Sequence, residues 1–329
     1  MTSELSDGKG VSPEKFLFIV GLPRSGTKLL RNLLNNHPGI SLLRNETDIY
    51  PYLLEFFALD RGEEWFEELW GEVKDAKFVL RREADGHPLD PALWKSLCSS
   101  ASAPDVFAAL IKAATPEAGP GVILGDKSPL HVRCVTELMR DFPNARMIHI
   151  VRDGREVALS AVDAWSKDPL RAIQQWTNSV MTAHNAGSRH SERFLEVRFE
   201  DLKSDPGAVL ERACGFLGVS YDSAMAQLKG SAEGLGRAKG QAKVLNLPDR
   251  TDDVPPAKLQ RMEEVFAPAA RQFGYAFKTQ ITRERVLGPL EMKLRRIGDL
   301  RGVAKFHIDQ FGWRDGLRYL WKRGNGTRR

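Results

Sequence analysis

The sequence has little cysteine. Only Cys98, Cys134 and Cys214 occur in 329 residues, they lie far apart, and no two have C-x-x-C spacing. An odd number of distant cysteines excludes the disulfide framework of small secreted domains and offers no zinc-binding set. We expect three ordinary buried side chains in a reducing compartment.

Long hydrophobic runs are also lacking. No stretch of eighteen consecutive apolar residues occurs, which argues against a transmembrane helix. The polar residues 1–8 lack the apolar core of a secretory signal, and we expect residues 1–13 to be a flexible N-terminus. These features predict a cytoplasmic protein.

The body of the chain has no excess of positive charge. Residues 281–329 contain 13 Lys and Arg against 5 Asp and Glu, which leaves 35 against 38 for residues 1–280. A nucleic-acid-binding domain usually carries a basic stripe across its folded body. We therefore expect no nucleic-acid partner, and the basic tail requires a separate explanation.

Short apolar runs alternate with stretches of helical spacing. Buried strands are predicted at 16–21, 122–125, 147–151 and 194–197, and helices are predicted near 129–141, 154–165, 166–190, after 200 and at 255–273. Strands that alternate with helices predict an α/β fold with a central parallel sheet flanked by helices. We expect one domain over 14–280.

Two segments of this domain differ from the alternation. Residues 50–120 are mostly helical in pattern, with aromatic and acidic side chains interleaved, and we expect this helical insertion to shape an acceptor pocket. Residues 230–253 are rich in Gly, Lys, Asn and Asp, which predicts an exposed loop.

A glycine-bearing turn joins the first strand to the first helix. Residues 21–28 are Gly-Leu-Pro-Arg-Ser-Gly-Thr-Lys. Glycines permit the tight turn, backbone N–H groups converge, and the helix N-terminus adds partial positive charge, so an anion is expected there. Arg24 and Lys28 supply further charge, and the turn predicts a phosphate-binding loop.

The turn differs from that of nucleotide-hydrolysing proteins. Those proteins place a lysine directly after the second glycine, followed by a hydroxyl residue that holds magnesium. Here Thr27 follows Gly26 and Lys28 comes one place late, a rotation of about 100° on a helix. A kinase that uses ATP and Mg²⁺ stays the rival interpretation, although no strand ends in a clear metal carboxylate.

Four segments together resemble a known family. Pro23-Arg24-Ser25-Gly26-Thr27, residues 150–155 with Ser160, residues 197–202, and residues 255–275 are similar to motifs of the sulfotransferases that use 3′-phosphoadenosine 5′-phosphosulfate (PAPS). The resemblance is closest to the branch of tyrosylprotein sulfotransferases and many bacterial enzymes. It implies transfer of a sulfuryl group from PAPS to an acceptor hydroxyl, with adenosine 3′,5′-bisphosphate (PAP) as product.

The resemblance also implies which residues bind the donor. The expected set is Pro23, Arg24, Ser25, Gly26, Thr27, Lys28, Arg152, Ser160 and Phe199. Arg152 and Ser160 match the motif for the 3′-phosphate, and a guanidinium with a hydroxyl suits a terminal phosphate. The alternative for Arg152 is an ion pair with Asp153 or Glu156 on a solvated face.

Three residues match catalytic positions of the family. Glu46 matches the base that takes the acceptor proton, while Lys127 and Arg24 match cations that neutralise charge on the leaving phosphate. The alternatives are a helix-start carboxylate for Glu46 and an ion pair with Asp126 for Lys127. No metal is expected in this scheme.

The histidines lack the spacing of metal ligands. His37, His131, His149 and His184 are each expected to be packed or surface residues.

The acceptor stays open at this point. Residues 239–250 contain no equivalent of the serine that completes the tyrosylprotein site, although Lys239, Lys243 and Asn246 lie nearby. A glycan, a glycolipid, a small phenol or a peptide tyrosine would each present a hydroxyl to Glu46. A non-catalytic anion-binding membrane adaptor is a further alternative to an enzyme.

The tail over 281–329 combines basic and apolar residues at helical spacing. Such a basic amphipathic arm can pack on the body or on a second subunit in a homodimer. It can also lie on an anionic membrane surface, which would place the protein at the inner face of the membrane near lipid-linked acceptors.

Overall fold

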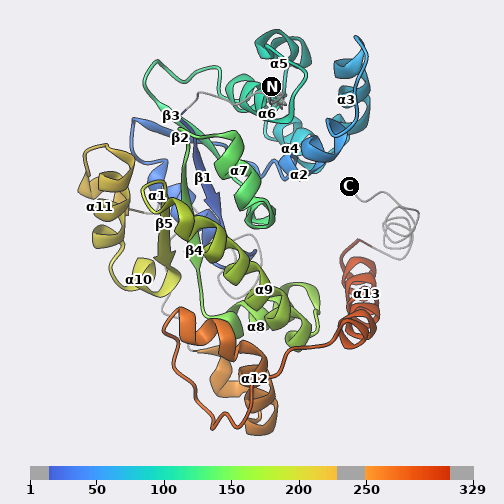
Figure 1. Ribbon diagram of the computed structural model, residues 1–329, viewed down its shortest axis with the longest axis vertical. Helices are drawn as coiled ribbons and strands as arrows, with labels where there is room; N and C mark the ends of the chain where they lie inside the picture. The colour runs from blue at the N-terminus through green and yellow to red at the C-terminus, as the bar shows by residue number, and fades with distance from the viewer. Residues whose placement is uncertain (1–14, 228–248, 312–329) are drawn as a thin grey trace, which may run out of the picture.

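A five-stranded parallel sheet forms the centre of the computed structural model, which describes residues 15–227 and 249–311 (Figure 1). The strands are β1 (Leu17–Val20), β2 (Ile40–Leu42), β3 (Ile123–Lys127), β4 (Arg146–Val151) and β5 (Phe194–Arg198). Their order is β2-β3-β1-β4-β5, with every pair parallel. The predicted α/β class with a parallel sheet is confirmed. The predicted flexible segment 1–13 lies outside the described residues.

Both faces of the sheet are buried. Phe16, Phe18 and Val20 belong to one hydrophobic cluster, and the intervening Leu17 and Ile19 belong to another. Successive side chains of a strand point to opposite faces, so a continuous apolar run is what a strand covered on both sides requires.

Helices cover the two faces of the sheet and also pack at the carboxyl end of β4 (Figure 1). One cluster contains side chains of α2 (Tyr50–Phe56), α3 (Trp65–Val73), α4 (Lys77–Ala84), α5 (Pro91–Leu97), α6 (Ala103–Ala113) and α7 (Val135–Asp141). The second contains side chains of α1 (Thr27–Leu34) and α11 (Pro206–Leu217), with α10 (Phe199–Ser204) between β5 and α11. The third joins α8 (Gly154–Trp165), α9 (Pro169–Gly187) and α12 (Pro256–Gln272).

The remaining elements are short turns and one long helix. The 3₁₀ turns are η1 (Pro129–Arg133), η2 (Ser188–His190), η3 (Ser223–Ala226) and η4 (Arg250–Asp253), and the last helix is α13 (Pro289–Phe311). None of the helices in the described ranges combines the length and hydropathy that crossing a bilayer requires.

Three details differ from the sequence-based expectation. The helix predicted over 129–141 is divided at Cys134 into η1 and α7. β2 was not predicted, because its three residues are too short to show a pattern. The prediction of an exposed loop over 230–253 is wrong at its end, since Arg250 and Thr251 in η4 are buried. Residues 228–248 lie outside the described part of the chain.

Gly125 offers a test of how tightly β3 lies against β1. A Cβ at this position would come within 1.8 Å of the Leu17 carbonyl oxygen, whereas nothing lies within 4 Å of a Cβ at Gly71 in α3. We expect Gly125→Ala to lower the free energy of unfolding by about 2 kcal/mol or more, because the backbone must move. Urea denaturation measures this change.

Gly71→Ala is the matched control for that substitution. It should raise the free energy of unfolding by about 0.5–1 kcal/mol, because alanine favours a helix interior. Equal effects of the two substitutions would contradict the close approach of β3 to β1.

Candidate functional site

The loop at the carboxyl end of β1 has an unusual backbone. Arg24 has a φ of 77° and Gly26 a φ of 91°, both in the left-handed region. Only glycine adopts that region without cost, so the conformation of Arg24 must be maintained by its surroundings. A Cβ on Gly26 would lie 2.3 Å from Cδ2 of Phe199, which also requires glycine there. Thr27 then begins α1.

Ser25 provides an observation that bears on ligand binding. Its side chain is buried, and its Oγ has no hydrogen-bond partner among the described residues. A buried hydroxyl without a partner costs about 1–3 kcal/mol, so such groups usually have a ligand or water to bind. The loop therefore fits an anion whose oxygen accepts this hydrogen bond.

Arg24 and Ser160, two of the residues predicted to bind the donor, lie in contact. Nε of Arg24 donates a hydrogen bond to Oγ of Ser160 over 2.9 Å. The Arg24 guanidinium also lies 6.0 Å from the ring centroid of Trp165. Ser160 and Trp165 both belong to α8, so this helix orients the Arg24 side chain.

Arg152 follows β4 and contacts the same loop. Its Nη1 donates to the Arg24 carbonyl oxygen over 3.0 Å, and its guanidinium lies 4.4 Å from the ring centroid of Phe199. Its Nη2 donates to Glu156 over 2.9 Å, so the alternative ion pair with Glu156 is present as well. Burial lowers the pKa of Arg152, an effect that Glu156 opposes. The ion pair is thus part of the site rather than of a solvated face.

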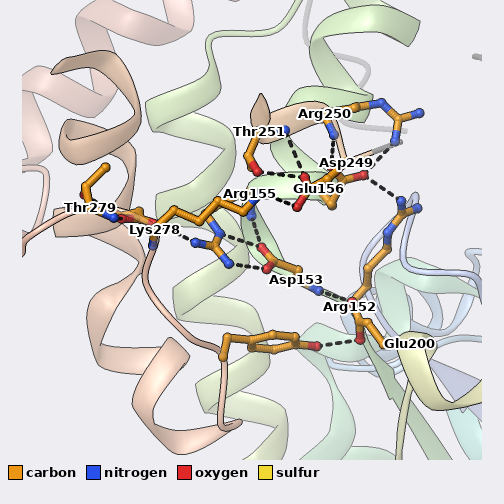
Figure 2. A network of polar contacts seen from close by, with 12 residues as sticks. Arg152, Asp153, Arg155, Glu156, Glu200, Asp249, Arg250, Thr251, Lys278 and Thr279 are labelled. Carbon is orange, nitrogen blue, oxygen red and sulfur yellow. Dashed lines mark hydrogen bonds and ion pairs between the residues drawn. The ribbon is translucent and has the colours of Figure 1, made fainter. Parts of the chain in front are cut away.

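Glu156 connects this arginine with a distant segment, and Glu200 does the same for the next residue, Asp153 (Figure 2). Glu156 accepts hydrogen bonds from the backbone N–H of Arg250 over 2.6 Å and from its Nη1 over 2.8 Å. Glu200 accepts from the N–H of Asp153 over 2.9 Å and from the Tyr275 hydroxyl over 3.0 Å. The N-terminus of α8 is thereby fixed to η4 and to the segment after α12.

A second part of the network surrounds Arg155 (Figure 2). The Arg155 guanidinium contacts both carboxylate oxygens of Asp153 and also Glu263. Glu263 accepts from the N–H groups of Lys278 and Thr279 over 2.9 and 2.8 Å. Sequence reasoning missed the contact between Arg155 and Glu263, because nothing in the local pattern links residues 108 positions apart.

The other flank of the loop carries Lys127 and Glu46. Lys127 ends β3 in register with Ile19 of β1, and its Nζ contacts Oε1 of Glu46. The Lys127 side chain is 2% exposed and that of Glu46 is 28% exposed. Burial lowers the pKa of Lys127 although Glu46 opposes it. Burial also disfavours ionised Glu46, but Lys127, Lys77 and Arg81 together outweigh this effect, and the pKa of Glu46 is lowered.

Asp126 does not take the partner that the alternative interpretation gave it. It accepts a hydrogen bond from Thr47 Oγ1 over 3.0 Å, while Lys127 turns to Glu46. Complete burial raises the pKa of Asp126 to about 6, although hydrogen bonds from Ser128 and Thr47 oppose this. Ser128 Oγ also accepts from the N–H of Asp48 over 3.0 Å. These contacts fix the backbone on the C-terminal side of Glu46.

Arg31 fixes the chain before Glu46. This α1 side chain is buried, and its Nη1 donates to the carbonyl oxygens of Leu43 and Arg44. Burial lowers its pKa to about 10. Sequence reasoning missed Arg31, because an arginine on an amphipathic helix ordinarily faces water. Its partners explain why the charge is buried here.

Three of the four histidines named above contact carboxylates. His149 and His184 contact the two carboxylate oxygens of Glu196 over 2.9 and 2.8 Å, and the buried His131 lies 3.3 Å from Asp126. Within 15–227 and 249–311, no group of three or more His, Cys, Asp or Glu side chains is placed to hold a metal ion.

The predicted site residues therefore fall into two groups beside one loop. β3 and β4 flank β1 in the sheet, so Lys127 with Glu46 lies on one side and Arg152 with Ser160 and Phe199 on the other. Pro23 lies in the loop and Lys28 in the first turn of α1, and both are half-buried. Residues 239–248 lie outside the described part of the chain.

Comparison with known proteins identifies the class to which this arrangement belongs. A model described as the sulfotransferase family matches residues 17–223, which include the loop, Glu46, Lys127, Arg152, Ser160 and Phe199. The chain belongs to the sulfotransferase family, and the predicted relationship to PAPS-dependent sulfotransferases is confirmed.

Individual relatives agree with this assignment. Protein-tyrosine sulfotransferase 1 of Danio rerio is 25% identical over 280 residues, which cover 79% of this chain and 72% of that protein. The Drosophila melanogaster protein-tyrosine sulfotransferase is 27% identical over 64% of this chain and 39% of its own length. The sulfotransferase domain of the Synechococcus PCC 7002 olefin synthase has the same fold, with 22% identity and a TM-score of 0.50 over 88% of this chain and 95% of that domain.

The contribution of the Lys127–Glu46 pair to the free energy of unfolding can be tested with a double-mutant cycle. Glu46→Gln leaves a buried ammonium without its counter-charge, and we expect the free energy of unfolding at pH 7 to fall by about 1–3 kcal/mol. Replacing both residues, Glu46→Gln with Lys127→Met, should restore much of that loss, as a double-mutant cycle in urea would measure. Additive effects of the two substitutions would contradict the pairing.

Proposed function

We propose that this chain transfers a sulfuryl group from PAPS to an acceptor hydroxyl. The observation that supports it is the position of the β1 loop, with its buried Ser25 hydroxyl, between Arg152 on one side and the Lys127–Glu46 pair on the other. A donor with two phosphate groups needs two anion sites, and an acceptor needs a base beside the reacting sulfur. The proposed catalytic unit spans residues 14–280.

The donor is assigned to the loop and the β4 side. Backbone N–H groups of residues 26–28, the Ser25 hydroxyl and the Lys28 side chain would bind the 5′-phosphosulfate, as anions bind at helix N-termini. Arg152 and Ser160 would bind the 3′-phosphate. The Phe199 ring already stacks on the Arg152 guanidinium and would contact the nucleotide.

The reaction is assigned to Glu46 and Lys127. Glu46 would accept the proton of the acceptor hydroxyl as its oxygen bonds to sulfur and the bond from sulfur to the phosphate oxygen breaks. The lowered pKa of Glu46 keeps this carboxylate ionised and able to accept a proton at neutral pH. Lys127 and Arg24 would neutralise the charge that grows on the departing PAP phosphate, where a preorganised cation stabilises the transition state most.

The relatives favour one class of acceptor for the first test. The Danio rerio and Drosophila melanogaster relatives compared above are named protein-tyrosine sulfotransferases, so a peptide tyrosine is the first acceptor to test. Glycans, glycolipids and small phenols present the same hydroxyl chemistry and form the rest of the acceptor panel.

Donor identity is tested by binding and by product formation. We expect PAP to bind with a measurable heat in calorimetry, with and without excess EDTA, and Ser25→Ala to weaken it by roughly tenfold, because the loop loses one donor. Labelled PAPS should yield a sulfated acceptor. Tight binding of ATP with Mg²⁺ and no heat from PAP would favour the kinase instead.

Turnover tests the roles of Lys127 and Glu46. We expect Lys127→Ala to reduce turnover by about 10²–10³-fold, because a cation that acts on developing charge is lost. Lys293→Ala is the matched control, since Lys293 is exposed on α13, outside both the loop and the 50–120 insertion. Activity of Glu46→Ala equal to that of the parent would contradict the base and favour a non-catalytic anion-binding protein.

A further inference from the structure

Large hydrophobic side chains are exposed at the start of α13. Val286, Leu290, Leu294, Ile297 and Leu300 are 70%, 71%, 60%, 48% and 42% exposed. Within the described residues nine large hydrophobic side chains are exposed, and five of them lie in this stretch of fifteen residues. This concentration marks a surface rather than scattered single residues.

The exposed side chains form one stripe. At about 100° per residue, positions 290, 294 and 297 fall within about 60° of one another, and position 300 lies about 60° further on the same side. A helix on a globular body normally turns such a stripe toward the core. α13 has the opposite orientation.

Polar contacts with the body cause that orientation. Asp299, buried on the other side of α13, accepts a hydrogen bond from the N–H of Asp168 over 2.6 Å and contacts Arg171. Arg295 donates to Asp168 over 2.8 Å and to Glu291 over 2.9 Å. The helix thus rests on the start of α9 through its charged side, at the edge of the molecule (Figure 1).

The outward side is basic as well as apolar. Lys293 and Arg296 are exposed and lie within about 40° of Leu300 around the helix, while the acidic residues Glu291 and Asp299 are turned toward the body. A helix with apolar residues flanked by lysine and arginine fits an interface between water and anionic lipid.

We infer that the outward face of α13 docks on an anionic lipid membrane, with the stripe inserted among acyl chains and Lys293 and Arg296 at the headgroups. A second copy of the chain fits less well, because a two-fold contact through this face would bring the same basic residues together. The inference concerns a surface away from the loop and does not depend on the proposed reaction.

Co-sedimentation of the full chain with vesicles tests this. We expect binding to vesicles of phosphatidylcholine with phosphatidylglycerol and at least tenfold weaker binding to phosphatidylcholine alone, because basic residues favour anionic surfaces. Leu294→Glu with Ile297→Glu should reduce binding at least tenfold. The control is Leu59→Glu with Leu80→Glu, two leucines exposed outside α13, which should bind as the parent does.

Charge reversal gives an independent second variant. Lys293→Glu with Arg296→Glu should also lose binding at least tenfold and should reduce its salt dependence, even if the apolar variant does not fold. Absence of parent binding to anionic vesicles would overturn the inference. So would equal binding of all variants, or a parent dimer that the α13 variants convert to monomer.

Discussion

The pairing of β1 with both β3 and β4 is the constraint on which the site depends. Because the three strands are parallel, their carboxyl ends meet at one edge, and the loop after β1 must emerge between the residues that end its neighbours. Lys127 ends β3 and Arg152 follows β4. The proposed donor, bound to that loop, would therefore have Lys127 on one side and Arg152 on the other.

Burial of these charges requires that each has a partner. Lys127 is almost fully buried beside Glu46, Arg152 shares Glu156 with Arg250, and Arg155 lies between two carboxylates. A buried charge without a partner is strongly destabilising, so the ion pairs permit a dense positive site within a stable fold. In the proposed site they would also hold the Arg152 guanidinium in place before an anion binds, which would reduce the reorganisation that binding requires.

Local sequence patterns predicted those structural features that depend only on neighbouring residues. The apolar run before Gly21 predicted β1, and Gly21 with Gly26 predicted the loop. Both predictions depend on adjacent residues, because a run of apolar side chains indicates burial and glycine permits a tight turn. Arg31, Thr47 and Glu263 were not predicted, because their importance depends on partners that only the folded chain brings together. Lys127 was assigned Asp126 as an alternative partner because the strand was predicted to end at 125. β3 continues to Lys127, and consecutive side chains of a strand point to opposite faces of the sheet.

The start and the middle of α9 have two different structural roles. α9 begins at Pro169 and is capped by Asp168, which accepts a hydrogen bond from Arg295 on the charged side of α13. The buried Trp176, further along α9, packs against the start of α8, directly after Arg152 and Asp153. Gly154 at the start of α8 leaves room for that tryptophan, because a Cβ there would lie 2.6 Å from the ring. The packing that fixes the N-terminus of α8 beside the loop thus also fixes the platform on which α13 turns its apolar stripe outward.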